Sequence, residues 1–157
     1  MDKYLFDTSS ISELYHFYEG RFVSLWKQLD LLINEGKINS IKEVKRELEA
    51  LNRNYNIDKR ENVKKDFYIE LTLEDFNSVK EILAIKGNQE LVHRRSINKG
   101  TPCADPFLVA KAENENYVVV TQEKYVANAI NLPSVCKSRG VRCINLEQFM
   151  EEQKWTF

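Results

Sequence analysis

The sequence lacks a hydrophobic run long enough to cross a membrane. Its longest apolar runs are only a handful of residues, whereas a transmembrane helix needs about 20. The chain opens on MDKYLFD, without the basic and apolar regions that form a secretory signal. We therefore expect a protein that does not insert into membranes.

Cysteine and glycine are both scarce. The three cysteines are an odd number, and they lack the C-x-x-C or Cys/His spacing of a zinc site. This pattern favours a reducing cytoplasm over a disulfide framework. No two of the five glycines stand close together, so the G-x-G-x-x-G turn of a dinucleotide-binding protein is missing.

An overall excess of basic residues is also absent, because 23 Lys and Arg face 24 Asp and Glu for a net charge of −1. A nucleic-acid partner would therefore have to be bound by a local patch. Residues 37–65 carry nine bases against five acids, a net of +4, and residues 86–101 carry four bases against one acid, a net of +3. Such patches are either solvated surfaces or phosphate contacts. Within the second patch, the candidate substrate-binding residues are Arg94, Arg95 and Lys99.

Short apolar runs alternate with amphipathic segments along the whole chain, which is typical of a parallel sheet joined by helices. The length of 157 residues suits one domain covering residues 1–157. We predict an α/β fold with three α/β/α layers around a central, mostly parallel five-stranded sheet. The expected strands are residues 3–7, 37–40, 67–71, 117–121 and 141–145, and the expected helices are residues 10–19, 21–35, 41–55, 74–86, 105–115, 132–139 and 146–153.

Two acidic residues follow strands of this predicted sheet. Asp7 comes directly after the apolar run YLF, and Glu123 follows YVVVT by two residues. The carboxyl ends of parallel strands form the edge where ligands bind in open sheets. Each acid alone is explained as a helix cap or turn residue, but their shared position suggests a site.

Two further acids occupy inward-leaning positions on predicted helices. At about 100° per residue, Glu47 lies roughly 75° from the centre of the apolar stripe of its helix, nearer the core than Glu43. Asp105 shares one helix face with Leu108, Val109 and Ala112. The simpler interpretations are a residue at the edge of the core for Glu47 and a helix N-cap for Asp105.

A hard divalent cation would explain why four acids gather, because Mg²⁺ and Mn²⁺ prefer oxygen ligands and would relieve the repulsion between the carboxylates. Bound metal of this kind activates water and stabilises the charge of a phosphodiester under attack. The pattern therefore predicts a metal-dependent nuclease. Its expected metal ligands and catalytic residues are Asp7, Glu47, Asp105 and Glu123.

The same residues resemble the motifs of the PIN domain, a family of small metal-dependent ribonucleases that includes the toxins of prokaryotic toxin–antitoxin pairs. DTSSI from Asp7 resembles the first motif, and SIKEVKREL, which contains Glu47, resembles the second. DPFLVAKA from Asp105 resembles the third motif, and TQE, ending on Glu123 where the family usually has Asp, resembles the fourth. The stretches LPSVCKSRG and GVRCINLEQF are similar to a subgroup of short PIN-like proteins.

This resemblance implies that the four acids converge at one end of a five-stranded parallel sheet, with Ser9 and Thr121 supporting the site. It implies Mg²⁺ or Mn²⁺ as cofactor, RNA as substrate and a toxin with a cognate antitoxin protein as partner, and it leaves a homodimer open. The alternative is an inactive PIN-like module that binds RNA or a protein without cleavage.

Other hydrolase and signalling classes fit the residues less well. A receiver domain needs an acidic pair on its first strand, and a haloacid-type phosphatase needs D-x-D-x-T, whereas position 9 is Ser. His16 and His93 have no Ser or Cys partner in a recognisable arrangement, so a catalytic triad is unsupported.

Overall fold

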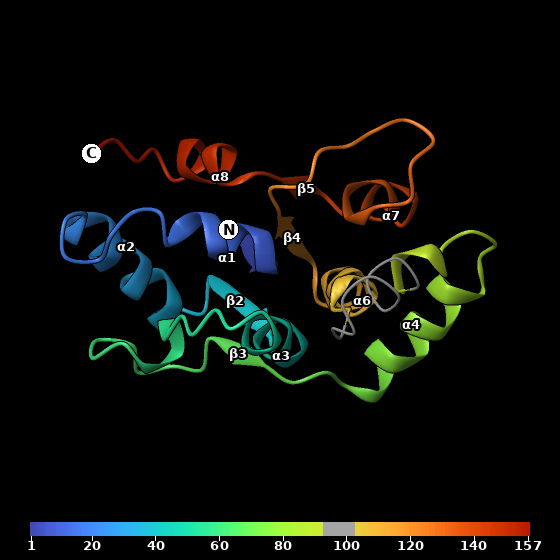
Figure 1. Ribbon diagram of the computed structural model, residues 1–157, viewed down its shortest axis with the longest axis horizontal. Helices are drawn as coiled ribbons and strands as arrows, with labels where there is room; N and C mark the ends of the chain where they lie inside the picture. Colours follow the sequence, from blue (N-terminus) through green and yellow to red (C-terminus); the bar gives the residue numbers. More distant parts are fainter. Residues whose placement is uncertain (93–102) are drawn as a thin grey trace.

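Five strands form one parallel sheet in the computed structural model, which describes residues 1–92 and 103–157 (Figure 1). The strands lie in the order β3-β2-β1-β4-β5, and all four strand pairs are parallel. The predicted α/β fold and its five strands are confirmed. The strands are β1 (Lys3–Phe6), β2 (Ile38–Ile41), β3 (Tyr68–Ile69), β4 (Tyr117–Val120) and β5 (Cys143–Ile144).

Helices cover both faces of this sheet, which confirms the three layers. Figure 1 shows α2 and α8 on one side of the strands and α4, α6 and α7 on the other. No helix in the described part of the chain is both long and apolar enough to span a bilayer. The helices are α1 (Thr8–Leu14), α2 (Val23–Asn34), α3 (Lys42–Ala50), α4 (Leu73–Ala84), α6 (Asp105–Glu115), α7 (Leu132–Ser138) and α8 (Leu146–Glu152), with a 3₁₀ turn η1 at Ile57–Lys59.

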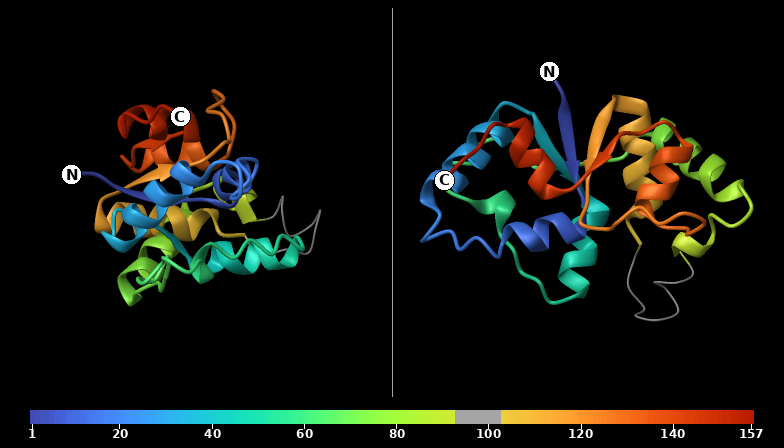
Figure 2. Two further views of the ribbon diagram at one scale, coloured as in Figure 1. Left: turned by 90° about the vertical axis from the view of Figure 1, so that its left-hand side faces the viewer. Right: turned by 90° about the horizontal axis from the view of Figure 1, so that it is seen from above.

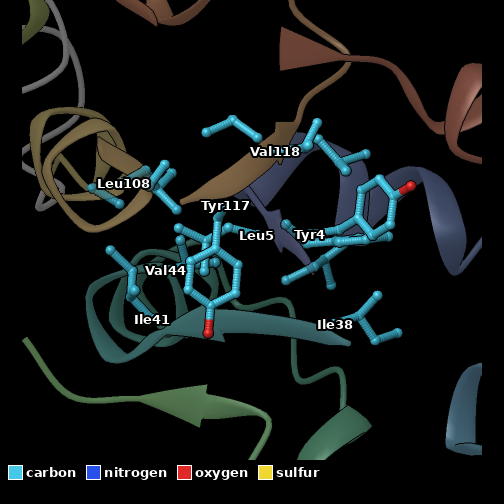
Figure 3. Packing of buried hydrophobic residues seen from close by; sticks show 14 of the residues in the cluster. Tyr4, Leu5, Ile38, Ile41, Val44, Leu108, Tyr117 and Val118 are labelled. Carbon is cyan, nitrogen blue, oxygen red and sulfur yellow. The ribbon is translucent and has the colours of Figure 1, made fainter. Parts of the chain in front are cut away.

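The central strand β1 is buried on both faces. Alternate side chains point to opposite sides of a strand, and Tyr4 and Phe6 both pack edge-to-face on Phe149 of α8. Figure 3 shows Val44 of α3 and Leu108 of α6 reaching toward the strands. Parallel strands covered by helices on both faces have to be apolar throughout, which explains the continuous runs YLF and YVVV.

An asparagine ends one helix earlier than predicted. The predicted helix over residues 41–55 ends at Ala50, and Asn52 follows with a φ of +56°. Tyr55 therefore does not belong to the helix, because asparagine tolerates this left-handed backbone conformation better than most residues. Asn116 plays the same role after α6, with a φ of +59°, and there the predicted range of residues 105–115 is correct.

A buried ion pair joins α4 to α6. The Nζ atom of Lys111 lies 2.7 Å from Oδ2 of Asp75, and both side chains are buried. Asp75 also accepts a hydrogen bond from Asn114 at 3.0 Å, and it forms a capping box with Thr72 at the start of α4. The position of α6, and therefore of Asp105 at its start, depends on this contact.

We predict that Lys111→Met destabilises the protein by ~3–5 kcal/mol, because it leaves the Asp75 carboxylate buried without its cation. Adding Asp75→Asn should restore much of that loss. Urea denaturation of the two variants measures both effects. Lys42→Met is the matched control, since it removes the exposed partner of Glu70 and should change the free energy of unfolding by less than ~0.5 kcal/mol. Equal effects of Lys111→Met and Lys42→Met would contradict the conclusion that the buried pair of Lys111 and Asp75 stabilises the fold.

Candidate functional site

Asp7 lies at the junction of β1, α1 and β4. It is the N-cap of α1, and its Oδ1 accepts a hydrogen bond from the Ser10 amide at 2.7 Å. The Ser9 hydroxyl donates to both carboxylate oxygens at 2.9 Å, and the Thr121 hydroxyl donates to Oδ2 at 2.5 Å. The carboxylate is thus a helix cap and also a bridge between the carboxyl ends of two neighbouring strands.

Burial strongly affects the charge of this carboxylate. The Asp7 residue is only 2% exposed. Burial raises the pKa of its carboxyl from 3.8 to about 6, against the opposing effect of the hydrogen bonds from Thr121, Ser10 and Ser9. Such perturbed carboxyl groups cluster at functional sites, although structural networks also contain them.

Glu47 of α3 contacts the start of α6, the helix whose first residue is Asp105. Glu47 is 3% exposed and Asp105 is 4% exposed. Oε2 of Glu47 accepts a hydrogen bond of 3.0 Å from the Ala104 amide, directly before Asp105. Ala104 is the N-cap and Asp105 is the first helical residue, so the interpretation of Asp105 as the cap is wrong. Its predicted position on the buried helix face is correct.

The Cys136 thiol on α7 is affected by the charges of both Asp7 and Asp105. Its neighbour Cys143 raises the pKa of the Cys136 thiol, burial raises it further, and the negative charges of Asp105 and Asp7 add to the increase. Both carboxylates therefore lie within electrostatic range of one sulfur atom. The right-hand view of Figure 2 shows β1 ending at the start of α1, with α3 close by.

Glu123 is placed differently from the other three acids. It is partly buried, and its amide donates to the Thr121 hydroxyl at 3.1 Å. Its Oε2 accepts a hydrogen bond of 3.2 Å from the Leu132 amide in the first turn of α7. One oxygen of Glu123 is therefore directed toward α7.

Two buried oxygens near these acids escaped the sequence analysis. Thr8 Oγ1 and Glu43 Oε1 are buried, and neither has a hydrogen-bond partner in the described part of the structure. Thr8 follows Asp7, and Glu43 lies one turn before Glu47. The other carboxylate oxygen of Glu43, Oε2, accepts a hydrogen bond of 3.3 Å from Arg46. An unsatisfied buried oxygen costs ~1–3 kcal/mol, which makes both atoms candidates for contact with a ligand.

The donor set of this region consists of carboxylate and hydroxyl oxygens, which suits a hard cation. The Ser9 hydroxyl also lies 3.2 Å from the Thr121 hydroxyl. If Ser9 donated its proton to Thr121 instead of Asp7, lone pairs of the Asp7 carboxylate would become available to a cation. Within residues 1–92 and 103–157, no three His, Cys, Asp or Glu side chains form a group that could hold a metal ion. The predicted substrate contacts Arg94, Arg95 and Lys99 lie outside the described residues.

Comparison with known families gives one match. Residues 4–157 match the family described as a domain of unknown function, DUF4411. No curated protein matches the chain. The matched range includes Asp7, Glu47, Asp105 and Glu123.

The raised pKa of Asp7 leads to a prediction for stability. The Asp7 carboxyl holds its proton more tightly in the folded protein than in the unfolded chain, because its pKa is higher there. The free energy of unfolding of wild type should therefore fall as the pH rises from about 4 to about 6. Asp7→Asn removes this titration and keeps a capping side chain. The variant should therefore gain ~3 kcal/mol relative to wild type between pH 4 and pH 7. Urea denaturation across this pH range measures the difference in unfolding free energy between the variant and wild type. A difference that does not change with pH would contradict the conclusion that burial raises the pKa of Asp7.

Proposed function

We propose that this chain, which belongs to the DUF4411 family, is a metal-dependent endoribonuclease that hydrolyses RNA phosphodiester bonds. The observation that supports the proposal is that Asp7 (directly after β1), Glu47 and Asp105 are all buried, and that Glu47 accepts a hydrogen bond from the amide directly before Asp105. Ligand sites in open α/β sheets lie at the carboxyl ends of the strands. Burying several carboxylates together is costly unless a cation compensates them.

The oxygen donors of these side chains are of the type that Mg²⁺ or Mn²⁺ binds. Asp7, Glu47 and Asp105 would hold the ion. The buried oxygens Thr8 Oγ1 and Glu43 Oε1, which have no hydrogen-bond partner in the described structure, lie on α1 and α3. Asp7 caps the first of these helices, and Glu47 lies on the second. When bound, such an ion activates a water molecule and stabilises the negative charge that develops on the phosphate. Asp7 is mostly ionised at neutral pH, since its pKa is about 6, and an ionised carboxylate is the form that binds metal.

Ser9 and Thr121 would position Asp7 for this role. Both hydroxyls donate to its carboxylate, and Thr121 is itself held by the Glu123 amide. Outer partners of this kind fix the orientation of a metal ligand. In this proposal Glu123 is the fourth acid, as in the PIN-like motif TQE.

The alternative is a PIN-like module that binds RNA or a protein without cleaving it. The contact between Glu123 and the Leu132 amide favours this alternative, because it engages the fourth acid in the first turn of α7. The narrower proposal of a toxin with an antitoxin partner is tested by asking whether a short antitoxin-like gene adjoins this one.

We expect the purified chain to cleave RNA with Mn²⁺ or Mg²⁺ and not with EDTA. Asp7→Asn and Asp105→Asn should each reduce the cleavage rate by ~100-fold or more, since losing even an outer partner costs about 10–100-fold. Because protons compete with the ion for Asp7, a higher metal concentration should be needed for half-maximal cleavage as the pH falls below about 6. A fluorogenic RNA measures the rates, and melting with and without Mn²⁺ measures metal-induced stabilisation.

The control for this experiment is Asp2→Asn, which removes an exposed carboxylate far from the sheet edge and should leave cleavage unchanged. If Asp7→Asn folds and cleaves like wild type, Asp7 is only a helix cap and the nuclease proposal fails. If wild type cleaves no RNA with either metal, the non-cleaving module is the correct interpretation.

Glu123 provides a separate test because its two roles respond differently to substitution. Glu123→Gln keeps an oxygen for the Leu132 amide and removes the charge, whereas Glu123→Asp keeps the charge and restores the usual PIN residue. A ligand position should therefore retain appreciable cleavage with Asp and lose it with Gln. Normal cleavage by Glu123→Gln would assign Glu123 to capping α7 alone.

A further inference from the structure

A cavity of about 660 Å³ lies at the end of α1 opposite Asp7. Its volume falls in the ~300–1,000 Å³ range of small-molecule sites. Since α1 has seven residues and rises about 1.5 Å per residue, only ~10 Å of helix separates the cavity from Asp7. Its lining includes Tyr15, Tyr18, Asn54, Tyr55, Asn56 and Lys59, together with Arg60 and the acids Glu19 and Glu61.

The wall of this cavity is a fixed stack of aromatic rings. Tyr15 and Tyr55 stack with centroids 4.3 Å apart and planes 13° apart, and Tyr15 also packs on Trp26 at 4.8 Å. The Arg60 guanidinium lies over Trp26 at 4.6 Å and pairs with Asp30. These contacts hold the rings in place before any ligand arrives, which lowers the entropy cost of binding.

The rim of the cavity carries groups that remain exposed. Tyr18 is 70% exposed, although a large aromatic side chain gains most from burial. Asn54 and Asn56 flank Tyr55 and are also exposed. Each carboxamide offers donors and an acceptor, which matches the hydrogen-bonding edges of nucleobases.

A second cavity of about 280 Å³ adjoins the first and shares Asn54, Tyr55 and Lys59 with it. Its other charged lining residues are Lys45, Arg53, Glu49 and Asp58. Asp58 pairs with Lys45 at 2.8 Å, whereas Arg53 and Lys59 are exposed cations. The second cavity thus lies beside α3, the helix that carries Glu47, and adds exposed cations to the site.

We infer that the tyrosine-lined cavity binds an unpaired nucleobase of single-stranded RNA, with the exposed cations Arg53 and Lys59 contacting the adjoining phosphates. This inference rests on the proposed ribonuclease function and identifies its substrate class. Stacking on aromatic rings and contacts of cations with phosphates are how proteins bind single strands without strict sequence preference. A base in a duplex stays stacked on its neighbours, so duplex RNA should be a poor ligand.

The test is the binding of a labelled single-stranded oligoribonucleotide in EDTA, followed by fluorescence anisotropy. Tyr18→Ala, and the double variant Asn54→Ala with Asn56→Ala, should each raise Kd about tenfold, as expected for the loss of one stacked or hydrogen-bonded base. An abasic oligonucleotide of the same length should bind both variants and wild type equally. Lys59→Ala should reduce the slope of log K against log salt by ~0.7.

Phe76→Ala is the matched control, because Phe76 is an exposed aromatic residue on α4 and should leave Kd unchanged. Unchanged binding by Tyr18→Ala, equal losses on the abasic strand, or equal affinity of wild type for duplex RNA would overturn the inference. RNA binding that depends on Tyr18 without any metal-dependent cleavage would keep this cavity assignment and refute the nuclease. Cleavage that depends on Asp7, with normal binding by Tyr18→Ala, would refute the cavity assignment alone.

Discussion

The buried carboxylate of Asp7 is the interaction on which the sheet edge depends. It receives hydrogen bonds from the first turn of α1 and from Thr121 after β4, so one side chain joins a strand, its helix and the neighbouring strand. Ser10 adds a second connection, because its hydroxyl donates to the carbonyl oxygen of Val120 at 2.8 Å. The geometry of the site therefore follows from how β1 and β4 end.

Polar contacts at this edge serve structure and proposed chemistry together. The hydroxyl of Ser40 donates to the carbonyl oxygen of Phe6 at 2.6 Å and ties β2 to β1 in the same way that Thr121 ties β4 to Asp7. These hydroxyls satisfy backbone and carboxylate oxygens where the strand pairing stops, as buried polar groups require. A rigid support of this kind is what a metal or substrate site needs to hold its ligands in one orientation.

The sequence predicted the elements whose residues are buried on both sides. The runs YLF and YVVV identified central strands, and the inward position of Asp105 agreed with its observed burial. Periodicity also correctly placed Glu47 nearer the core than Glu43, since Glu47 is buried and Glu43 is only partly buried. It failed at residues 51–55, where Asn52 ends α3 and Tyr55 turns to stack on Tyr15. That tertiary contact, and the cavity it builds, could not be read from local pattern.

The order of the strands also determines when the acidic site can exist during synthesis of the chain. Asp7 is translated 114 residues before its partner Thr121. Parallel pairing between β1 and β4 has to wait for that distant segment, since contacts between residues far apart in sequence form only after a long loop closes. Until β4 emerges from the ribosome, β1 can pair only with β2, and Asp7 remains hydrated in an unfinished sheet. A nascent chain of this protein therefore carries Asp7 long before it can assemble the site, because the site also needs β4 and Thr121.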